Sequence, residues 1–330
     1  MLPSFFTLDI PDLQMSIKKY SARFPMMGTF IDLVVYHANG EKLIKEAYFQ
    51  LEQYAQRFTV NQPDSELMRV NQNAGIAPVC VQPDLFALIK LAKLVSEDRH
   101  HPFNIAIGPL VKAWRIGFKD AKVPSREEIE TKLKLVDPSQ VILDEHQCSV
   151  YLNHVGMEID LGAIAKGYFA DQVKRELVSA GVENGFISLG GNVLTIGQSP
   201  TNTNQAWNVG IQNPLGERGD VIRVVPLKGM SMVTSGINER FFQSNGQRYH
   251  HLLDAKTGMP IETDIAGLTI LSEHSVDGEI WSTAGFLPSM QESMSYLNQQ
   301  VGIEAVAVSK LGEVVVTEGL IDRNGGIYLR

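Results

Sequence analysis

The sequence predicts an α+β fold made of largely antiparallel sheets with helices packed around them. Segments with helical spacing of apolar residues are interleaved with hairpin-like strands rather than arranged in strict β-α-β order. The 330 residues are 44% hydrophobic, which is enough for a large packed core. No internal repeat and no Pro/Gly-rich linker divides the chain. We therefore expect an irregular N-terminal arm over residues 1–20 and a single domain over residues 21–330.

The elements of the first half follow from periodicity and capping signals. Apolar residues recur at helical spacing in two segments, and Ser125 with Glu128 forms a capping-box pattern that starts a further helix. β-branched and apolar residues dominate the strand-like segments, and a polar turn separates the last two. The expected elements are a strand in 24–36, helices over 40–58 and 83–98, a helix from 125, and a hairpin of 141–143 with 149–152.

The second half is predicted to contain most of the strands. A helix over residues 166–180 ends at Gly181, which suits the position after a helix C-terminus. Leu311-Gly312 separates two β-rich runs, 304–309 and 313–317, and predicts a closing hairpin. Between the helix over 166–180 and this hairpin we expect strands near 186–189, 193–196, 207–211, 221–227, 231–234 and 266–271, and helices over 276–286 and 290–299.

Composition excludes several classes of protein. The net charge is −8, without a Lys/Arg run, so we expect no nucleic-acid partner. Cys80 and Cys148 form no C-x-x-C or Cys/His cluster, which argues against a zinc or redox site and suits a reducing compartment. No apolar run reaches 18 residues, so no membrane span is expected. With no signal peptide or lipoprotein cysteine, the chain as given is expected to be cytoplasmic, although an exported protein without its signal would look the same.

The common nucleotide-site and hydrolase motifs are absent. The chain contains no G-x-x-x-x-G-K-[ST], G-x-G-x-x-G, H-E-x-x-H or G-x-S-x-G. A nucleotide would therefore have to bind by another arrangement.

Two small-residue segments could approach a ligand closely. In DLGAIAKGYFA, Asp160 ends a strand and Lys166 starts a helix, whose N-terminus and positive charge suit a phosphate. A plain strand–turn–helix junction with a solvated lysine explains the same pattern. A structural turn is the better explanation of the paired glycines of SLGGN, residues 188–192, taken alone.

Two later segments carry polar side chains. His251 precedes an Asp-x-x-Thr-Gly turn and could serve as a general base. The adjacent His250 would point to the opposite face of an extended chain, so at most one of the two faces a given site. Glu279 and Thr283 are four apart on a helix and offer two oxygens to a hard cation. A surface histidine and a solvated Glu beside a helical Thr are the plain alternatives.

In this order, the segments resemble the ApbE family of flavin transferases (FAD:protein FMN transferases). The likeness extends over about residues 27–302 and implies an ApbE-like single domain. Its motifs are Met27-Gly28-Thr29, Asp64–Asn71, Phe103–Val111 with Trp114, DLGAIAKGYFAD, SLGGN, Thr234-Ser235-Gly236, HHLLDAKTGMP and EIWSTA.

The resemblance implies a set of site residues. The flavin-nucleotide contacts would be Met27, Asn61, Pro102, Phe103, Asn104, Asp160, Lys166 and Leu253. A magnesium ion would be bound by the backbone oxygen of Ala163 and by Glu279 and Thr283, with Ser282 beside them. His251 would be the general base, and Asp254 would orient its loop. Glu279 stands where the family usually has Asp, and Asn61 makes aromatic stacking at that position doubtful.

The implied reaction is Mg²⁺-dependent protein flavinylation. FAD would be cut at its diphosphate, FMN would pass to a Thr or Ser of an acceptor flavoprotein, and AMP would leave. The alternatives are an FAD pyrophosphatase, a non-catalytic FAD-binding protein, and a structural protein that binds no flavin. The proposed catalysis requires the turn near Ala163 and the helix of Glu279 and Thr283 to converge on a shared cation beside the diphosphate.

Overall fold

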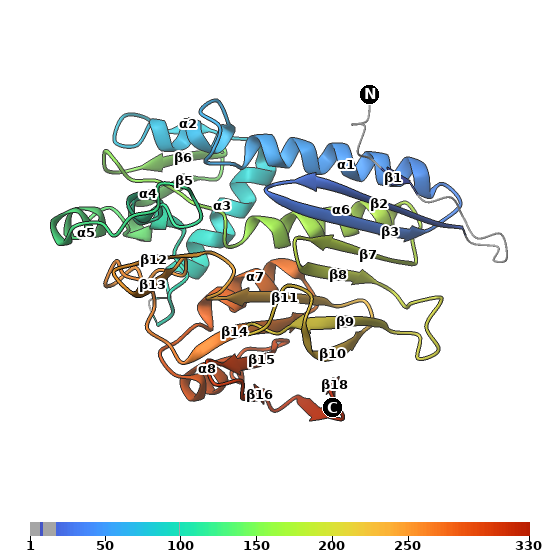
Figure 1. The fold of residues 1–330 in the computed structure, drawn as a ribbon. Coiled ribbons are helices and arrows are strands. Elements are labelled where there is room, and N and C mark those ends of the chain that lie inside the picture. The colour runs from blue at the N-terminus through green and yellow to red at the C-terminus, as the bar shows by residue number, and fades with distance from the viewer. Residues whose placement is uncertain (1–6, 9–17, 99) are drawn as a thin grey trace.

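A computed structural model describes residues 7–8, 18–98 and 100–330. In this part of the chain, a nine-stranded sheet forms the centre of the molecule, and each neighbouring pair in it is antiparallel (Figure 1). Its strands, in spatial order, are β1 (Thr7–Leu8), β2 (Lys19–Met26), β3 (Thr29–Tyr36), β7 (Asn184–Leu189), β8 (Asn192–Ile196), β11 (Ser231–Gly236), β14 (Ile265–Ser272), β15 (Glu304–Ser309) and β16 (Val314–Val316).

The N-terminal region differs from the expectation in two ways. β2 and β3 form a hairpin instead of one strand over 24–36, because Met27 (φ 53°) and Gly28 (φ 71°) both adopt the left-handed conformation of a tight two-residue turn. The expected irregular arm is wrong at β1, which pairs with Ala22 and Arg23, and at Lys19 and Tyr20, which belong to β2. The rest of residues 1–17 lies outside the described residues.

Helices cover one face of the large sheet. α1 (Gly40–Arg57), α3 (Pro83–Ser96) and α6 (Ala165–Ser179) share one core with the sheet, and α1 lies against α6 (Figure 1). Further along, α7 (Ser275–Ala284) packs on β11 and β14, and α8 (Met290–Leu297) on β15. The amphipathic spacing read from the sequence therefore places these helices correctly, within two residues at their ends.

The opposite face is covered by a second, four-stranded sheet in the order β17-β18-β10-β9. Its strands are β9 (Trp207–Gln212), β10 (Val221–Leu227), β17 (Leu320–Arg323) and β18 (Gly326–Leu329). Strand β3 shows how the two cores form. Its Ile31 and Leu33 face the helices, whereas Val34 and Tyr36 face the small sheet, because side chains alternate along a strand.

The remaining elements form one end of the molecule, beside α3 (Figure 1). They are α2 (Glu66–Gln72), β4 (Val79–Cys80), η1 (Ile105–Ile107), α4 (Gly108–Trp114), α5 (Arg126–Leu133), η2 (Pro138–Gln140), β5 (Val141–Asp144), β6 (Ser149–Leu152), β12 (Phe241–Ser244) and β13 (Gln247–His250). The predicted capping at α5 is confirmed, since the Glu128 backbone N–H donates to Ser125 Oγ at 3.1 Å.

Several short elements were not predicted from the sequence: α2, α4, β4, the hairpin β12–β13, and β17 with β18. Gly181 (φ 92°) follows α6 as expected. Cys80 and Cys148 are both free thiols. Within the described residues, no helix combines the length and the apolar character needed to cross a bilayer.

Candidate active site

The start of α6 lies directly against α7. A Cβ added to Gly167 would lie 2.3 Å from the Ser275 carbonyl oxygen and 2.8 Å from Glu279 Cγ, so the two helices meet at a distance that only glycine allows. Both carboxylate oxygens of Asp171 on α6 accept backbone N–H groups of Ser275 and Val276, each at 2.8 Å, and thus cap α7. The start of α6, which directly follows the Ala163 turn, therefore lies against the helix of Glu279 and Thr283. The approach of Ala163 itself to that helix stays a prediction.

Glu279 is the charged centre of this junction. The residue is 5% exposed, and its Oε1 accepts hydrogen bonds from Lys166 Nζ at 3.0 Å and Asn192 Nδ2 at 2.8 Å. Asn192 is held in turn, because its Oδ1 accepts the Ser275 hydroxyl at 2.6 Å. The SLGGN segment thus contributes its asparagine to the site, while Gly190 and Gly191 form the β7–β8 turn.

The two hydroxyls of α7 differ in their surroundings. Ser282 is fully buried and donates to the Glu279 carbonyl oxygen at 3.1 Å, while its oxygen lies 2.9 Å from Ser235 Oγ on β11. Thr283 is half-buried, and its hydroxyl has no hydrogen-bond partner among the described residues. Thr283 is therefore the hydroxyl left open to a ligand, and Ser282 is already used within the protein.

Asp160 is tied to the 102–105 segment, and it lies in a loop after β6 rather than at the end of a strand as predicted. The Asp160 N–H donates to the Ile105 carbonyl at 3.0 Å, and Asp160 Oδ1 accepts the Gly162 N–H at 2.7 Å. Burial raises the pKa of Asp160, against the opposing effect of the Gly162 N–H. Asn104 accepts the Ala106 N–H at 2.8 Å and so caps η1. These contacts bring two of the segments expected to bind the flavin nucleotide side by side.

Asn71 fixes the chain just before Asp160. Its side-chain amide donates to the Ile159 carbonyl at 3.0 Å and accepts the Ile159 N–H at 2.8 Å, as a neighbouring strand would. It comes from α2, 88 residues away, and its role could not be read from local pattern.

The two adjacent histidines have different environments, as expected. His250 is 7% exposed, and its Nε2–H donates to the Ile261 carbonyl at 3.1 Å. His251 is half-buried, and its Nδ1 lies 3.1 Å from the Arg240 carbonyl oxygen. Because a carbonyl oxygen only accepts, Nδ1 carries the proton and Nε2 keeps its lone pair.

The pKa of His251 is lowered by its surroundings. Burial lowers its pKa to about 4, and the charges of Arg240 and Lys166 act in the same direction. Lys166 also pairs with Glu279. The candidate base is therefore neutral at pH 7 and lies within electrostatic reach of the α6–α7 junction.

Asp254 shapes the loop that follows His251. Its Oδ1 accepts the Lys256 N–H at 2.9 Å, and its N–H donates to the Met259 carbonyl at 2.8 Å. Trp114 anchors the loop, since its Nε1–H donates to the Gly258 carbonyl at 2.8 Å. This geometry suits the predicted orienting role of Asp254.

Residues 27–307 match the model of the ApbE family. The chain belongs to the ApbE family. It is 40% identical over 298 residues to an FAD:protein FMN transferase of Klebsiella pneumoniae (strain 342), with 90% of this chain and 92% of the relative covered. A protein of the same name from Treponema pallidum (strain Nichols) is 34% identical, with 93% and 89% covered.

Solved structures of the ApbE family share the fold. The ApbE protein of Thermotoga maritima superposes with a TM-score of 0.83 at 29% identity, covering 91% of this chain and 97% of that one. The apo form of a Pseudomonas stutzeri flavinyl transferase ApbE gives 0.80 at 25% identity, with 93% and 96% covered. The predicted α+β architecture is thereby confirmed as the ApbE architecture.

The structure places the other residues named from the ApbE resemblance in several parts of the fold. Leu253 and Phe103 have buried side chains in two different cores, and Pro102 is half-buried. Met27 is in the β2–β3 turn, and Asn61 is exposed in the loop between α1 and α2. No hydrogen bond or ion pair in the described part of the chain joins Met27 or Asn61 to the other site residues.

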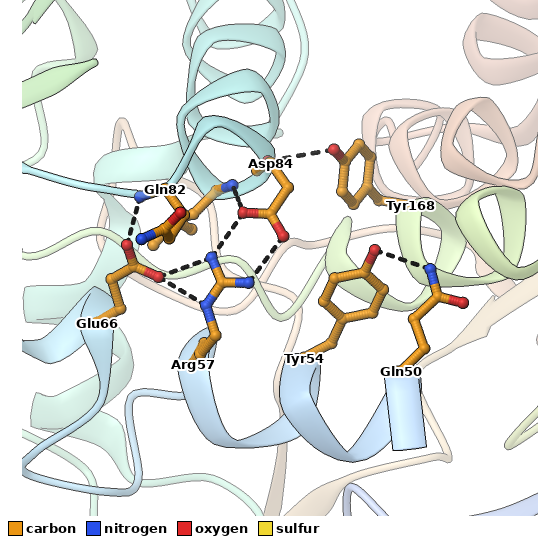
Figure 2. A network of polar contacts seen from close by, with 8 residues as sticks. Gln50, Tyr54, Arg57, Glu66, Gln82, Asp84 and Tyr168 are labelled. Carbon is orange, nitrogen blue, oxygen red and sulfur yellow. Dashed lines mark hydrogen bonds and ion pairs between the residues drawn. The ribbon is translucent and has the colours of Figure 1, made fainter. Parts of the chain in front are cut away.

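Figure 2 shows a polar network that the sequence analysis missed. Arg57 at the end of α1 donates to Glu66 at 2.8 Å and to both oxygens of Asp84 at 2.8 and 2.6 Å. Tyr168 on α6 donates to the Asp84 carbonyl at 3.2 Å. Because Arg57 and Glu66 bracket the loop that carries Asn61, the network holds both ends of this loop against α3, which Tyr168 in turn ties to α6.

Proposed function

We propose that this protein is an FAD:protein FMN transferase that attaches FMN through a phosphoester bond to a Thr or Ser of an acceptor flavoprotein and releases AMP. The observation that carries the proposal is the 40% identity to a transferase of that name over nine-tenths of both chains. The geometry agrees with it, since a lysine, a buried carboxylate and a histidine with a free Nε2 lie within electrostatic reach of one another.

The protein's own groups account for the proton transfer. The acceptor hydroxyl attacks the FMN phosphorus, and His251 Nε2 takes its proton. The bond between this phosphorus and the bridging oxygen breaks, and the electron pair leaves with the AMP phosphate. The Arg240 carbonyl keeps the Nδ1 proton in place, so the same tautomer is presented at the start of each turnover.

We further propose that Mg²⁺ is held by the Glu279 carboxylate, the Thr283 hydroxyl and the Ala163 carbonyl. The residues fit such an ion: the donors are all oxygens, and the buried Glu279 already holds the cationic Lys166 ammonium. No three His, Cys, Asp or Glu side chains of the described residues gather in one place, so an ion here depends on neutral oxygens beside one carboxylate. When bound, Mg²⁺ neutralises charge on the diphosphate.

Mass spectrometry of a candidate acceptor flavoprotein tests the reaction. After incubation with this protein, FAD and Mg²⁺, we expect a mass gain equal to an FMN ester on a Thr or Ser. Free FMN without modification of the acceptor would instead show an FAD pyrophosphatase. Intact FAD bound to the protein would show a non-catalytic flavin-binding protein.

A further inference from the structure

Arg240 lies directly beside the candidate base. Its carbonyl oxygen accepts both the backbone N–H and the Nδ1–H of His251, each at 3.1 Å. Its side chain runs over Gly117, where an added Cβ would lie 3.1 Å from Arg240 Cδ. The bare backbone of Gly117 therefore leaves room for the arginine stem to pass.

The guanidinium of Arg240 has no partner of its own. It forms no hydrogen bond, ion pair or ring contact within the described residues, and it is exposed. By contrast, Arg57 binds Glu66 and Asp84, and Arg223 binds Asp322 through two nitrogens at 2.7 and 2.9 Å. A planar donor fork without an internal partner is suited to a phosphate.

The guanidinium of Arg240 acts electrostatically on two segments of the site. Its charge reaches both Asp160, at the nucleotide segment, and His251. Two lysines act on the same groups, Lys112 on Asp160 and Lys166 on His251. Lys112 is engaged by Glu158 at 2.6 Å and Lys166 by Glu279, which leaves Arg240 as the cation of this group without an acid partner in the described structure.

We propose that Arg240 is a further catalytic residue, whose guanidinium donates hydrogen bonds to the non-bridging oxygens of the phosphate that departs as AMP. This inference rests on the proposed function. As the acceptor oxygen bonds to the FMN phosphorus and His251 takes its proton, the breaking P–O bond leaves its electron pair on the AMP phosphate. Donors placed where this charge develops stabilise the transition state more than the ground state.

Two substitutions separate the side chain from the backbone carbonyl that holds His251. Arg240→Gln removes the charge, Arg240→Lys keeps it without the fork, and both retain the carbonyl. Arg248→Gln is the matched control, because Arg248 lies on the β12–β13 hairpin that directly follows Arg240 and stacks on Phe241. With FAD, Mg²⁺ and a saturating acceptor, we expect Arg240→Gln to lower kcat by about 10²-fold or more, Arg240→Lys to lower it less, and the control to match wild type.

The pH profile gives a second measurement. Removing the Arg240 charge should raise the pKa of His251, whose other cationic or titratable neighbours are Lys166 and His250. The acid limb of the kcat/KM profile should therefore move to higher pH in Arg240→Gln and stay in place in Arg240→Lys. A role confined to folding would not produce this difference.

Two results would overturn the assignment. One is an Arg240→Gln variant as active as the Arg248→Gln control. The other is a loss that appears only as a raised KM for the acceptor, which would place Arg240 in acceptor binding. A wild-type protein that releases no AMP from FAD with any acceptor would refute the proposed function itself.

Discussion

The two halves of the candidate site are held in different ways. At the α6–α7 junction, backbone packs on backbone at Gly167, and Glu279 is buried among hydrogen bonds from both sides. His251 follows the hairpin β12–β13, whose residues are mostly exposed, and is held through one carbonyl oxygen. Substitutions at the junction should therefore change transfer activity and stability together, whereas substitutions at the hairpin should change activity alone.

The largest expected effect tests the hairpin half. His251→Ala removes the Nε2 lone pair, and the rate of FMN transfer should fall by about 10²–10⁴-fold. FAD affinity and the thermal unfolding midpoint should stay near wild type, because the backbone N–H of residue 251 still reaches the Arg240 carbonyl. Flavinylation assays beside an FAD titration measure both. Full transfer by this variant would refute the base assignment.

The next effect tests the charge at the junction. Glu279→Gln keeps the shape of the side chain and removes its charge, so the protein should need at least about 10-fold more Mg²⁺ for half-maximal activity. Glu176→Gln, on the exposed part of α6, is the control. The Mg²⁺ titration of transfer is the measurement. An unchanged titration would remove Glu279 from the set of ligands.

A packing substitution tests whether stability and activity are linked there. In Gly167→Ala, the new methyl group overlaps the Ser275 carbonyl, and overpacking of this kind lowers the free energy of unfolding by about 1–3 kcal/mol. Transfer activity should fall with it, because α7 carries Glu279 and Thr283. Glu176→Ala on the same helix should change neither quantity. If Gly167→Ala were stable and active, the comparison drawn above would fail.

The smallest expected effect is a pH dependence of stability. Burial lowers the pKa of His250 and of His251 from 6.5 to about 4. Between these values the unfolded chain binds more protons than the folded one, so the free energy of unfolding should fall as the pH falls from 6.5 toward 4. His250→Gln removes one of the two titrating groups and should flatten this slope in thermal unfolding. An equal slope in the variant would contradict the assignment.

The elements that could be predicted from the sequence are those with a strong local signal. The 3.6-residue spacing of Leu43, Ala47 and Leu51 identified α1, and the order of motifs identified the family. The turn at Met27 was missed because a non-glycine residue adopts positive φ there. The hairpin β12–β13 carries a local signal that was not used, since Asn245 (φ 52°) and Gly246 (φ 77°) form its two-residue turn.

The site shows the same division. Lys166, Glu279 and His251 were identified because each lies in a motif, and the structure adds how they are connected. Asn71, Asn192 and Arg240 act through partners 88, 87 and 11 residues away, and no local pattern reports such pairings. The use of Ser282 inside the protein likewise depends on Ser235 of a distant strand.

The amide of Asn71 has a chemical consequence for the lifetime of the enzyme. It presents one donor and one acceptor to the peptide groups of Ile159, and no carboxylate can do both. Spontaneous deamidation at this residue would therefore set an anionic oxygen against the Ile159 carbonyl, next to the segment that carries Asp160. A single chemical change in α2, outside any reacting group, would therefore loosen the segment that we propose to bind the nucleotide.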